Sequence, residues 1–91
     1  MRTKAETKRV DAANRELRKL TFNKFFEAVP FGKIDDILEK QGFKHYRHGT
    51  FDGVYVGTTG KVADFISENS YVIVEWYKMP TGRFEVNTYV S

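Results

Sequence analysis

The chain has 91 residues, of which 41% are hydrophobic and 30% are charged, and its formal net charge at pH 7 is +3. This length permits one small domain with a modest core, so we expect a single domain over residues 1–91. Because the chain contains no cysteine, disulfides, cysteine nucleophiles and thiolate metal sites are excluded.

No stretch of the sequence approaches the roughly 20 apolar residues that are needed to span a bilayer. The N-terminus leads into charged residues and not into the apolar block of a signal peptide. We therefore expect a cytoplasmic protein that does not contact a membrane.

The charges are distributed unevenly along the chain. Residues 1–24 carry eight basic and three acidic side chains, residues 25–50 carry four of each, and residues 51–91 carry three basic and five acidic side chains. A basic N-terminal segment on a mildly acidic body indicates a polyanionic partner such as nucleic acid, and the alternative is a helix whose charges only keep it soluble.

The first predicted element is an amphipathic helix over residues 3–20, which contain neither Gly nor Pro. Its apolar stripe is formed by Val10, Ala13, Leu17 and Leu20. Four cationic side chains gather on the opposite side of the helical wheel, namely Lys4, Lys8, Arg15 and Lys19. The stripe offers little area, so we expect the first two turns to fray unless they are docked.

Two shorter helical segments follow. Phe22, Phe25, Phe26 and Val29 have helical spacing between Thr21, a predicted N-cap, and Pro30, which predicts a short helix with three core phenylalanines, or a bent continuation of the first helix. A further helix over residues 33–41 has two acids, Asp35 and Asp36, in its first turn and ends before Gly42. Gly42 and Phe43 are the residues that a Schellman cap requires, with Phe43 contacting Leu38.

Residues 43–90 are predicted to form an antiparallel sheet around the run from Tyr71 to Tyr77, which is the most strand-like segment of the chain. We expect strands over residues 43–47 and 54–56, a turn over residues 57–60 and a strand over residues 61–66. A helix over residues 61–66 is the alternative, because Val62, Phe65 and Ile66 also fit one helical face.

Two hairpins set the predicted strand register. In the last hairpin, Pro80 and Gly82 suit a three-residue loop that pairs Trp76 with Val86, Val74 with Thr88 and Val72 with Val90. In the preceding hairpin, a two-residue turn at Glu68 and Asn69 pairs Phe65 with Val72 and Ala63 with Val74. These residues share the predicted core face. The opposite face is predicted to carry Val62, Asp64, Ile66, Tyr71, Ile73, Glu75, Tyr77, Glu85, Asn87 and Tyr89.

The stretch from Gly53 to Val90 resembles small SH3-like barrels of the KOW and Tudor type. The resemblance lies in G-V-Y-V-G-T-T-G-K-V, where a Gly-bearing turn joins two strands, followed by Y-V-I-V-E-W and a final hairpin. It implies a module that binds RNA, nucleoprotein machinery or peptides and does not catalyse a reaction. The predicted fold is therefore α+β, with a helical segment over residues 1–42 packed on a small antiparallel sheet or SH3-like barrel over residues 43–91.

No catalytic motif is evident in the sequence, and we expect neither an enzyme nor a bound cofactor. His45 and His48 point to opposite faces if they lie on a strand, which disfavours a metal site. A general base at His48, with Asp52 or Glu75 as its partner, remains the enzymatic alternative.

Two binding functions remain. In the first, nucleic acid is bound by Lys4, Lys8, Arg15 and Lys19, and the surface is extended by Lys44, Tyr46 and Arg47, where basic and aromatic residues alternate. In the second, a protein partner or a second copy docks on the sheet face with Tyr71, Tyr77 and Tyr89, joined by Arg83, or on the edge of the last strand.

Overall fold

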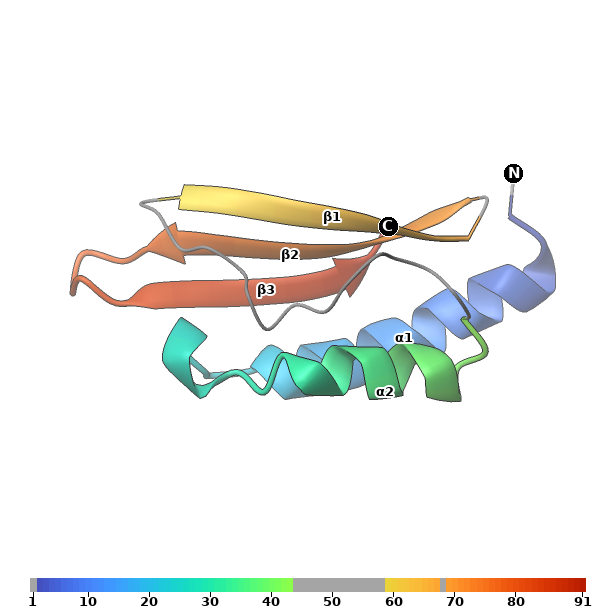
Figure 1. Ribbon diagram of the computed structural model, residues 1–91, viewed down its shortest axis with the longest axis horizontal. Coiled ribbons are helices and arrows are strands. Elements are labelled where there is room, and N and C mark those ends of the chain that lie inside the picture. Colours follow the sequence, from blue (N-terminus) through green and yellow to red (C-terminus); the bar gives the residue numbers. More distant parts are fainter. Residues whose placement is uncertain (1, 44–58, 68) are drawn as a thin grey trace.

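The computed structural model describes residues 2–43, 59–67 and 69–91 (Figure 1). Helix α1 (Lys4–Thr21), the 3-10 turn η1 (Phe26–Ala28) and helix α2 (Gly32–Lys40) precede strands β1 (Thr59–Ser67), β2 (Ser70–Lys78) and β3 (Phe84–Val90). The strands form an antiparallel sheet in the order β1-β2-β3. The fold is α+β, as predicted, with a helical layer against the sheet.

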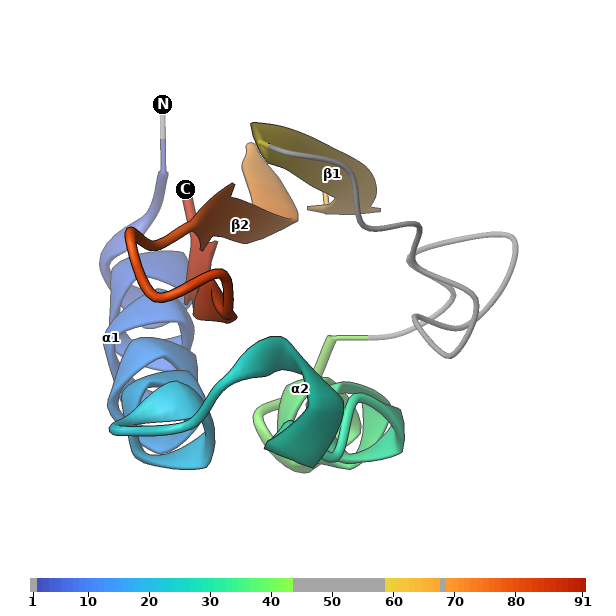
Figure 2. The same cartoon turned by 90° about the vertical axis from the view of Figure 1, so that its left-hand side faces the viewer.

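The two helices lie side by side and run in opposite directions beneath the sheet (Figures 1 and 2). Helix α1 also packs along β3, which places it at that edge of the sheet. None of the helices in the described part of the chain is both long and apolar enough to cross a membrane.

Helix α1 confirms the prediction from the apolar periodicity. Thr3 is its N-cap, because the Thr3 hydroxyl accepts a hydrogen bond from the backbone N–H of Glu6. The predicted stripe of Val10, Ala13, Leu17 and Leu20 is buried in the core. One face of α1 is therefore buried in the core, and the opposite face is exposed to solvent.

The N-terminal end of α1 is docked on the β1-β2 turn. The Glu6 carboxylate accepts hydrogen bonds from the hydroxyls of Ser67 and Ser70, and it pairs with Arg9 at 3.3 Å. Arg2 donates a further hydrogen bond to Ser70. This anchor holds in place the turns of α1 that the apolar stripe alone would leave weakly attached.

The Glu6 anchor predicts a stability that depends on pH. The hydrogen bond from Ser67, together with Ser70 and Arg9, holds the pKa of Glu6 below its ordinary value of 4.5, although burial acts in the opposite direction. A carboxylate with a lowered pKa in the folded state stabilises the fold above pH 4.5 and loses this effect as the pH falls through the lowered value. We expect Glu6→Gln to cost roughly 1 to 2 kcal/mol at pH 7.

Urea unfolding of the native protein and Glu6→Gln between pH 7 and pH 3 measures this effect. The difference in the free energy of unfolding should shrink as the pH falls below about 4.5, because both proteins then lack the charge. The comparison cancels the titration of every other carboxyl group. A difference that stays constant down to pH 3 would contradict the role of the Glu6 charge.

The segment after α1 differs from the prediction. Thr21 is the last residue of α1, where its hydroxyl donates to the Leu17 carbonyl, so it is not an N-cap. Only Phe26–Ala28 is helical, as a single 3-10 turn. Phe22 is not a core residue, because 68% of its surface is exposed, whereas Val29 is buried and Phe26 packs against the core. The backbone of Asn23 has a positive φ of 55°, and this turn breaks the helical spacing on which the prediction relied.

Helix α2 ends as the sequence predicts. Gly42 has a φ of 91° and donates its N–H to the Glu39 carbonyl, and Phe43 donates to the Leu38 carbonyl at 3.0 Å. These two hydrogen bonds define a Schellman cap. Leu38 and Phe43 are both buried, so the cap also turns the chain back into the core.

The β2-β3 hairpin has the predicted register. Trp76 pairs with Val86, Val74 with Thr88 and Val72 with Val90, and all six residues are buried. Met79 and Arg83 close the loop through a backbone hydrogen bond, and Gly82 has a φ of 88°, the conformation expected of glycine at this position.

Strand β1 is a strand and not a helix, but its predicted register is wrong by one residue. Ser67 pairs with Ser70 as the predicted turn requires. An irregularity between Phe65 and Ser67 then shifts the ladder, so that Phe65 pairs with Tyr71 and Val62 with Val74. A shift of one residue exchanges the two faces. Ile66 is therefore buried and Phe65 exposed, the reverse of the prediction. The strand also begins at Thr59, within the predicted turn.

We define the outer face of the sheet as the side chains that point away from the helical layer. Its apolar members are Ala63, Phe65, Tyr71, Ile73, Tyr77 and Tyr89, and its charged members are Lys61, Glu75 and Glu85. The three described strands do not show a closed barrel, and the resemblance to SH3-like barrels stays a prediction. The strands predicted over residues 43–47 and 54–56 lie, apart from Phe43, outside the described residues.

The β3 edge is bonded to the helical layer. The Asn14 carboxamide of α1 accepts the N–H of Val90 at 2.6 Å and donates to the Val90 carbonyl at 3.1 Å. At the other end of β3, Phe25 forms a β-bridge with Glu85. Asn14 therefore satisfies the backbone N–H and C=O of Val90 as a neighbouring strand would, so β3 does not offer these two groups to a docking strand.

Candidate nucleic-acid interface

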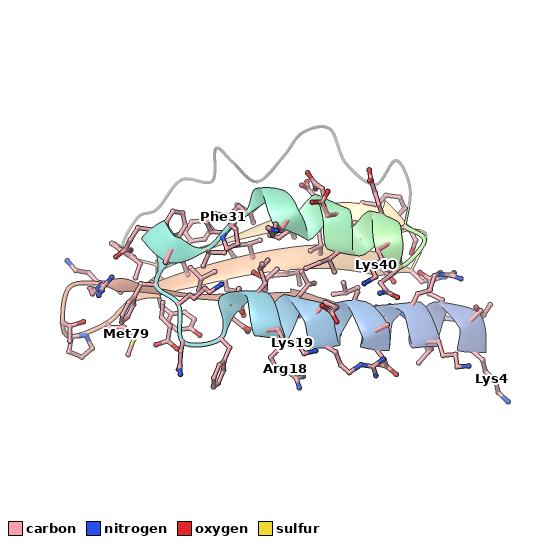
Figure 3. The ribbon with its side chains drawn as sticks, turned by 90° about the horizontal axis from the view of Figure 1, so that it is seen from below. Lys4, Arg18, Lys19, Phe31, Lys40 and Met79 are labelled. Atoms are coloured by element: carbon pink, nitrogen blue, oxygen red, sulfur yellow. The ribbon has the colours of Figure 1, made fainter. Side chains whose placement is uncertain are left out.

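The four predicted cationic residues lie on the solvent-facing side of α1. The side chains of Lys4, Lys8, Arg15 and Lys19 are all exposed, opposite the buried stripe of the same helix. Lys4 and Lys19 project from near the two ends of α1, as Figure 3 shows. At 1.5 Å per residue, the row is about 22 Å long. Arg18, also exposed, lies next to this row.

A second set of cations surrounds a groove between α1 and α2. The groove has a volume of about 380 Å³, and Leu20 and Ile37 supply its apolar lining. Four lysines line it, namely Lys19, Lys24, Lys33 and Lys40, together with the acids Glu16 and Asp36. Lys19 belongs to both the row on α1 and the groove, so the two sets form one continuous basic surface, which we call the basic surface.

The antiparallel packing of α1 and α2 creates this groove. Lys24 follows α1, whereas Lys33 and Lys40 lie on α2, two helical turns apart and therefore on one face. Sequence reasoning missed these three lysines because they are far from Lys19 along the chain. The seven-residue spacing of Lys33 and Lys40 was a signal for their shared face, but it did not indicate that this face would lie beside α1.

The acids near the basic surface moderate its charge only partly. Lys19 pairs with Glu16 at 3.8 Å, and both side chains are well exposed. An exposed pair of this kind contributes little to stability, so Lys19 can exchange Glu16 for another anion at small cost. Arg9, in contrast, is engaged with Glu6 in the anchor of α1 and is not counted in the basic surface.

The remaining predicted nucleic-acid residues, Lys44, Tyr46 and Arg47, lie outside the described residues, as do His45, His48, Asp52 and Tyr55. Glu75, the suggested partner of His48, lies on the outer face and accepts a hydrogen bond from Asn87 at 3.4 Å. Within the described ranges, no group of three or more His, Cys, Asp or Glu side chains is placed to hold a metal ion.

The predicted protein-interface tyrosines share the outer face of the sheet. The exposed fraction is 49% for Tyr71 and 39% for Tyr77, and Tyr89 is half-buried beside Ile73. Partial burial, followed by the negative charges of Glu85 and Glu75, raises the pKa of Tyr77 above its ordinary value of 10.0. Burial and Glu75 raise the pKa of Tyr89 in the same direction. Both phenols are therefore neutral at physiological pH.

Arg83 does not join these tyrosines. Its guanidinium forms an ion pair with Glu27 and lies 3.8 Å from the centre of the Phe25 ring. These contacts attach the β2-β3 loop to the segment around η1. Arg83 therefore serves the fold at this position.

No known protein family, curated protein or solved structure matches this chain.

Proposed function

We propose that the protein is a non-catalytic nucleic-acid-binding module that contacts phosphates through its basic surface. The observation that carries this proposal is the row of Lys4, Lys8, Arg15 and Lys19, which is exposed on one face of a helix whose opposite face is buried in the core. The fold itself does not bury these four cations. Four exposed cations on a rigid support are suited to binding a polyanion.

The dimensions of the row support this function. One strand of a duplex carries a phosphate every 3.4 Å along the axis, so a row of about 22 Å runs past about six phosphates. Four cations can each meet one of them. The groove lysines Lys24, Lys33 and Lys40 extend the cationic area beside the row, and the apolar lining from Leu20 and Ile37 can contact the face of a base or a sugar.

The expected affinity for nucleic acid depends steeply on salt. With four phosphates neutralised on a single strand, the log-log slope is about −2.8, so binding weakens by roughly 50-fold between about 50 and 200 mM salt. Fluorescence anisotropy of labelled single-stranded RNA, single-stranded DNA and duplex DNA measures this dependence. Replacing Lys4, Lys8, Arg15 and Lys19 together by Ala should weaken binding at low salt by about 10- to 100-fold and flatten the slope.

A matched pair of single variants separates the basic surface from net charge alone. Lys8→Ala on α1 and Lys78→Ala at the end of β2 each remove one exposed lysine. Only Lys8→Ala should reduce the magnitude of the slope, by about 0.7. Equal effects of the two variants would indicate binding by net charge without a defined surface. The absence of binding to all three probes at low salt would refute the proposal.

The second candidate function is a protein-interaction module that uses the outer face of the sheet. It is favoured by the exposure of Tyr71 beside the equally exposed Phe65, and by the exposure of Tyr77 at the other end of β2. This candidate predicts that the variant with all four cations of α1 replaced by Ala still binds the protein partner, because the outer face lies on the side of the sheet opposite the helical layer.

A further inference from the structure

The outer face has a contiguous apolar half next to the β1-β2 turn. Phe65 pairs with Tyr71 across the strands, and their rings meet edge to face with centroids 5.7 Å apart. Ala63, Ile73 and Tyr89 form the next row across the sheet. Phe65 and Tyr71 are each about half exposed, at 48% and 49%. An aromatic cluster of this kind is typical of a protein-protein interface.

The other half of the outer face is polar and has both signs of charge. In the strand register, Lys61 lies opposite Glu75, and Glu75 lies opposite Asn87. Glu85 lies one row further along, opposite Tyr77. Two acids and one base on this half disfavour phosphate groups as ligands, in contrast to the basic surface of the helical layer.

We propose that a second copy of this chain covers the outer face, in a symmetric dimer whose two-fold axis runs along the strands. This inference is independent of the proposed nucleic-acid function. The axis places β1 of each copy over β3 of the other and keeps equivalent rows together. The small Ala63 then meets the large Tyr89 of the second copy. Lys61 meets its Asn87, with its acids Glu75 and Glu85 diagonal to that position. The two Glu75 side chains meet at the axis, where a Lys61 flanks them on each side.

Charge and hydrogen bonding favour this arrangement over three other contacts between copies. Two helical layers repel each other because both carry the basic surface. A helical layer against an outer face would bury cations of the basic surface against the apolar half, which leaves charges desolvated. Pairing along β3 is opposed by Asn14, which bonds both backbone groups of Val90. Face-to-face contact also leaves both basic surfaces on the outside of the dimer.

The size of the outer face predicts a weak dimer. Strands of 7 to 9 residues are about 25 Å long, and three of them are about 14 Å wide. Because the side chains interdigitate, the accessible area that each copy loses is larger than the flat area of its sheet. Two copies therefore bury on the order of 1,000 Å² in total, which is typical of weak and transient complexes. We therefore expect dissociation in the micromolar range.

Sedimentation equilibrium from about 1 to 500 µM tests the dimer, with a limiting mass of twice the 10.6 kDa chain. Phe65→Ser should weaken dimerisation by at least 10-fold, because it removes an aromatic ring from the apolar half. The matched control is Phe22→Ser, since Phe22 is equally aromatic, is 68% exposed and lies outside the outer face. It should leave the dissociation constant unchanged. A monomer at 500 µM, or equal effects of the two variants, would overturn the proposal.

A charge exchange tests the two-fold arrangement itself. Lys61→Glu and Glu85→Lys should each weaken the dimer by about 10-fold, because each places like charges in contact across the interface. The double variant restores opposite charges at positions 61 and 85 but leaves two acids at positions 61 and 75, so it should dimerise more tightly than either single variant without reaching the native dissociation constant. Both residues are exposed, so the variants should fold, and circular dichroism is used to check this. If the double variant dimerises as weakly as the two single effects combined would give, the predicted contact is refuted.

Discussion

Replacing Trp76 by Ala should lower the free energy of unfolding by about 3 to 5 kcal/mol. Trp76 is the largest buried side chain of β2, with 5% of its surface exposed, and its ring meets Phe26 edge to face at 6.4 Å. It also covers Gly60 of β1. Trp76 thus joins the sheet to the segment after α1, and its removal leaves a cavity that three elements would have to fill.

Urea unfolding followed by circular dichroism measures the loss for Trp76→Ala. Within the described residues, the buried Nε1 of Trp76 has no hydrogen-bond partner, which carries a cost of about 1 to 3 kcal/mol. Trp76→Phe removes this group and keeps a ring, so it should cost clearly less than Trp76→Ala. Tyr77→Ala, at an exposed neighbouring position, is the control and should cost under about 1 kcal/mol. Equal losses for Trp76→Ala and Tyr77→Ala would contradict the core position of Trp76.

Gly60→Ala should destabilise the protein by about 3 kcal/mol, at the upper end of the range for overpacked sites. A Cβ at position 60 would lie 2.3 Å from Cζ2 and 2.6 Å from Cε2 of Trp76, well inside van der Waals contact. The indole is rigid and buried, so the strand or the ring has to move. The direction of the effect is the opposite of what β propensity predicts, because alanine is normally at least as favourable as glycine in a strand.

A double-mutant cycle isolates this steric cause. In a Trp76→Leu background the ring is absent, and Gly60→Ala should then be neutral or slightly stabilising. The coupling energy between the two positions is therefore expected to be about 3 kcal/mol. A Gly60→Ala loss that is unchanged in the Trp76→Leu background would show that the backbone conformation, and not the indole, requires glycine.

Local signals in the sequence predicted α1, α2 and the last hairpin correctly. The stripe from Val10 to Leu20, the Schellman cap at Gly42 and the loop around Gly82 each depend on residues that are close together in the chain. The register of β2 with β3 followed from the loop alone, because a hairpin loop aligns both of its strands. The exposure of Lys4, Lys8, Arg15 and Lys19 followed from the same helical periodicity.

Two predictions failed because a local change in the backbone altered which side chains face the core. The irregularity between Phe65 and Ser67 reverses the faces of β1, although the adjoining turn was predicted correctly. It brings Ile66 into the core and Phe65 onto the outer face. Similarly, the turn at Asn23 removes Phe22 from the core that its spacing predicted. The sequence contains no local signal for the irregularity in β1, which is decided by what packs best against the rest of the molecule. Asn23, in contrast, is a residue type that favours a positive φ after a helix, and it could have indicated that α1 ends before it.

The sequence by itself determined the α+β class, the amphipathic α1 with its basic row, and the pairing of β2 with β3, because short-range periodicity and turn chemistry are sufficient for each. Only the tertiary structure decided which aromatic side chains lie on the outer face, where Gly60 meets Trp76, and how Lys24, Lys33 and Lys40 gather around one groove. These features join residues that are distant in the chain, and they depend on how whole elements pack against each other, which no local pattern records.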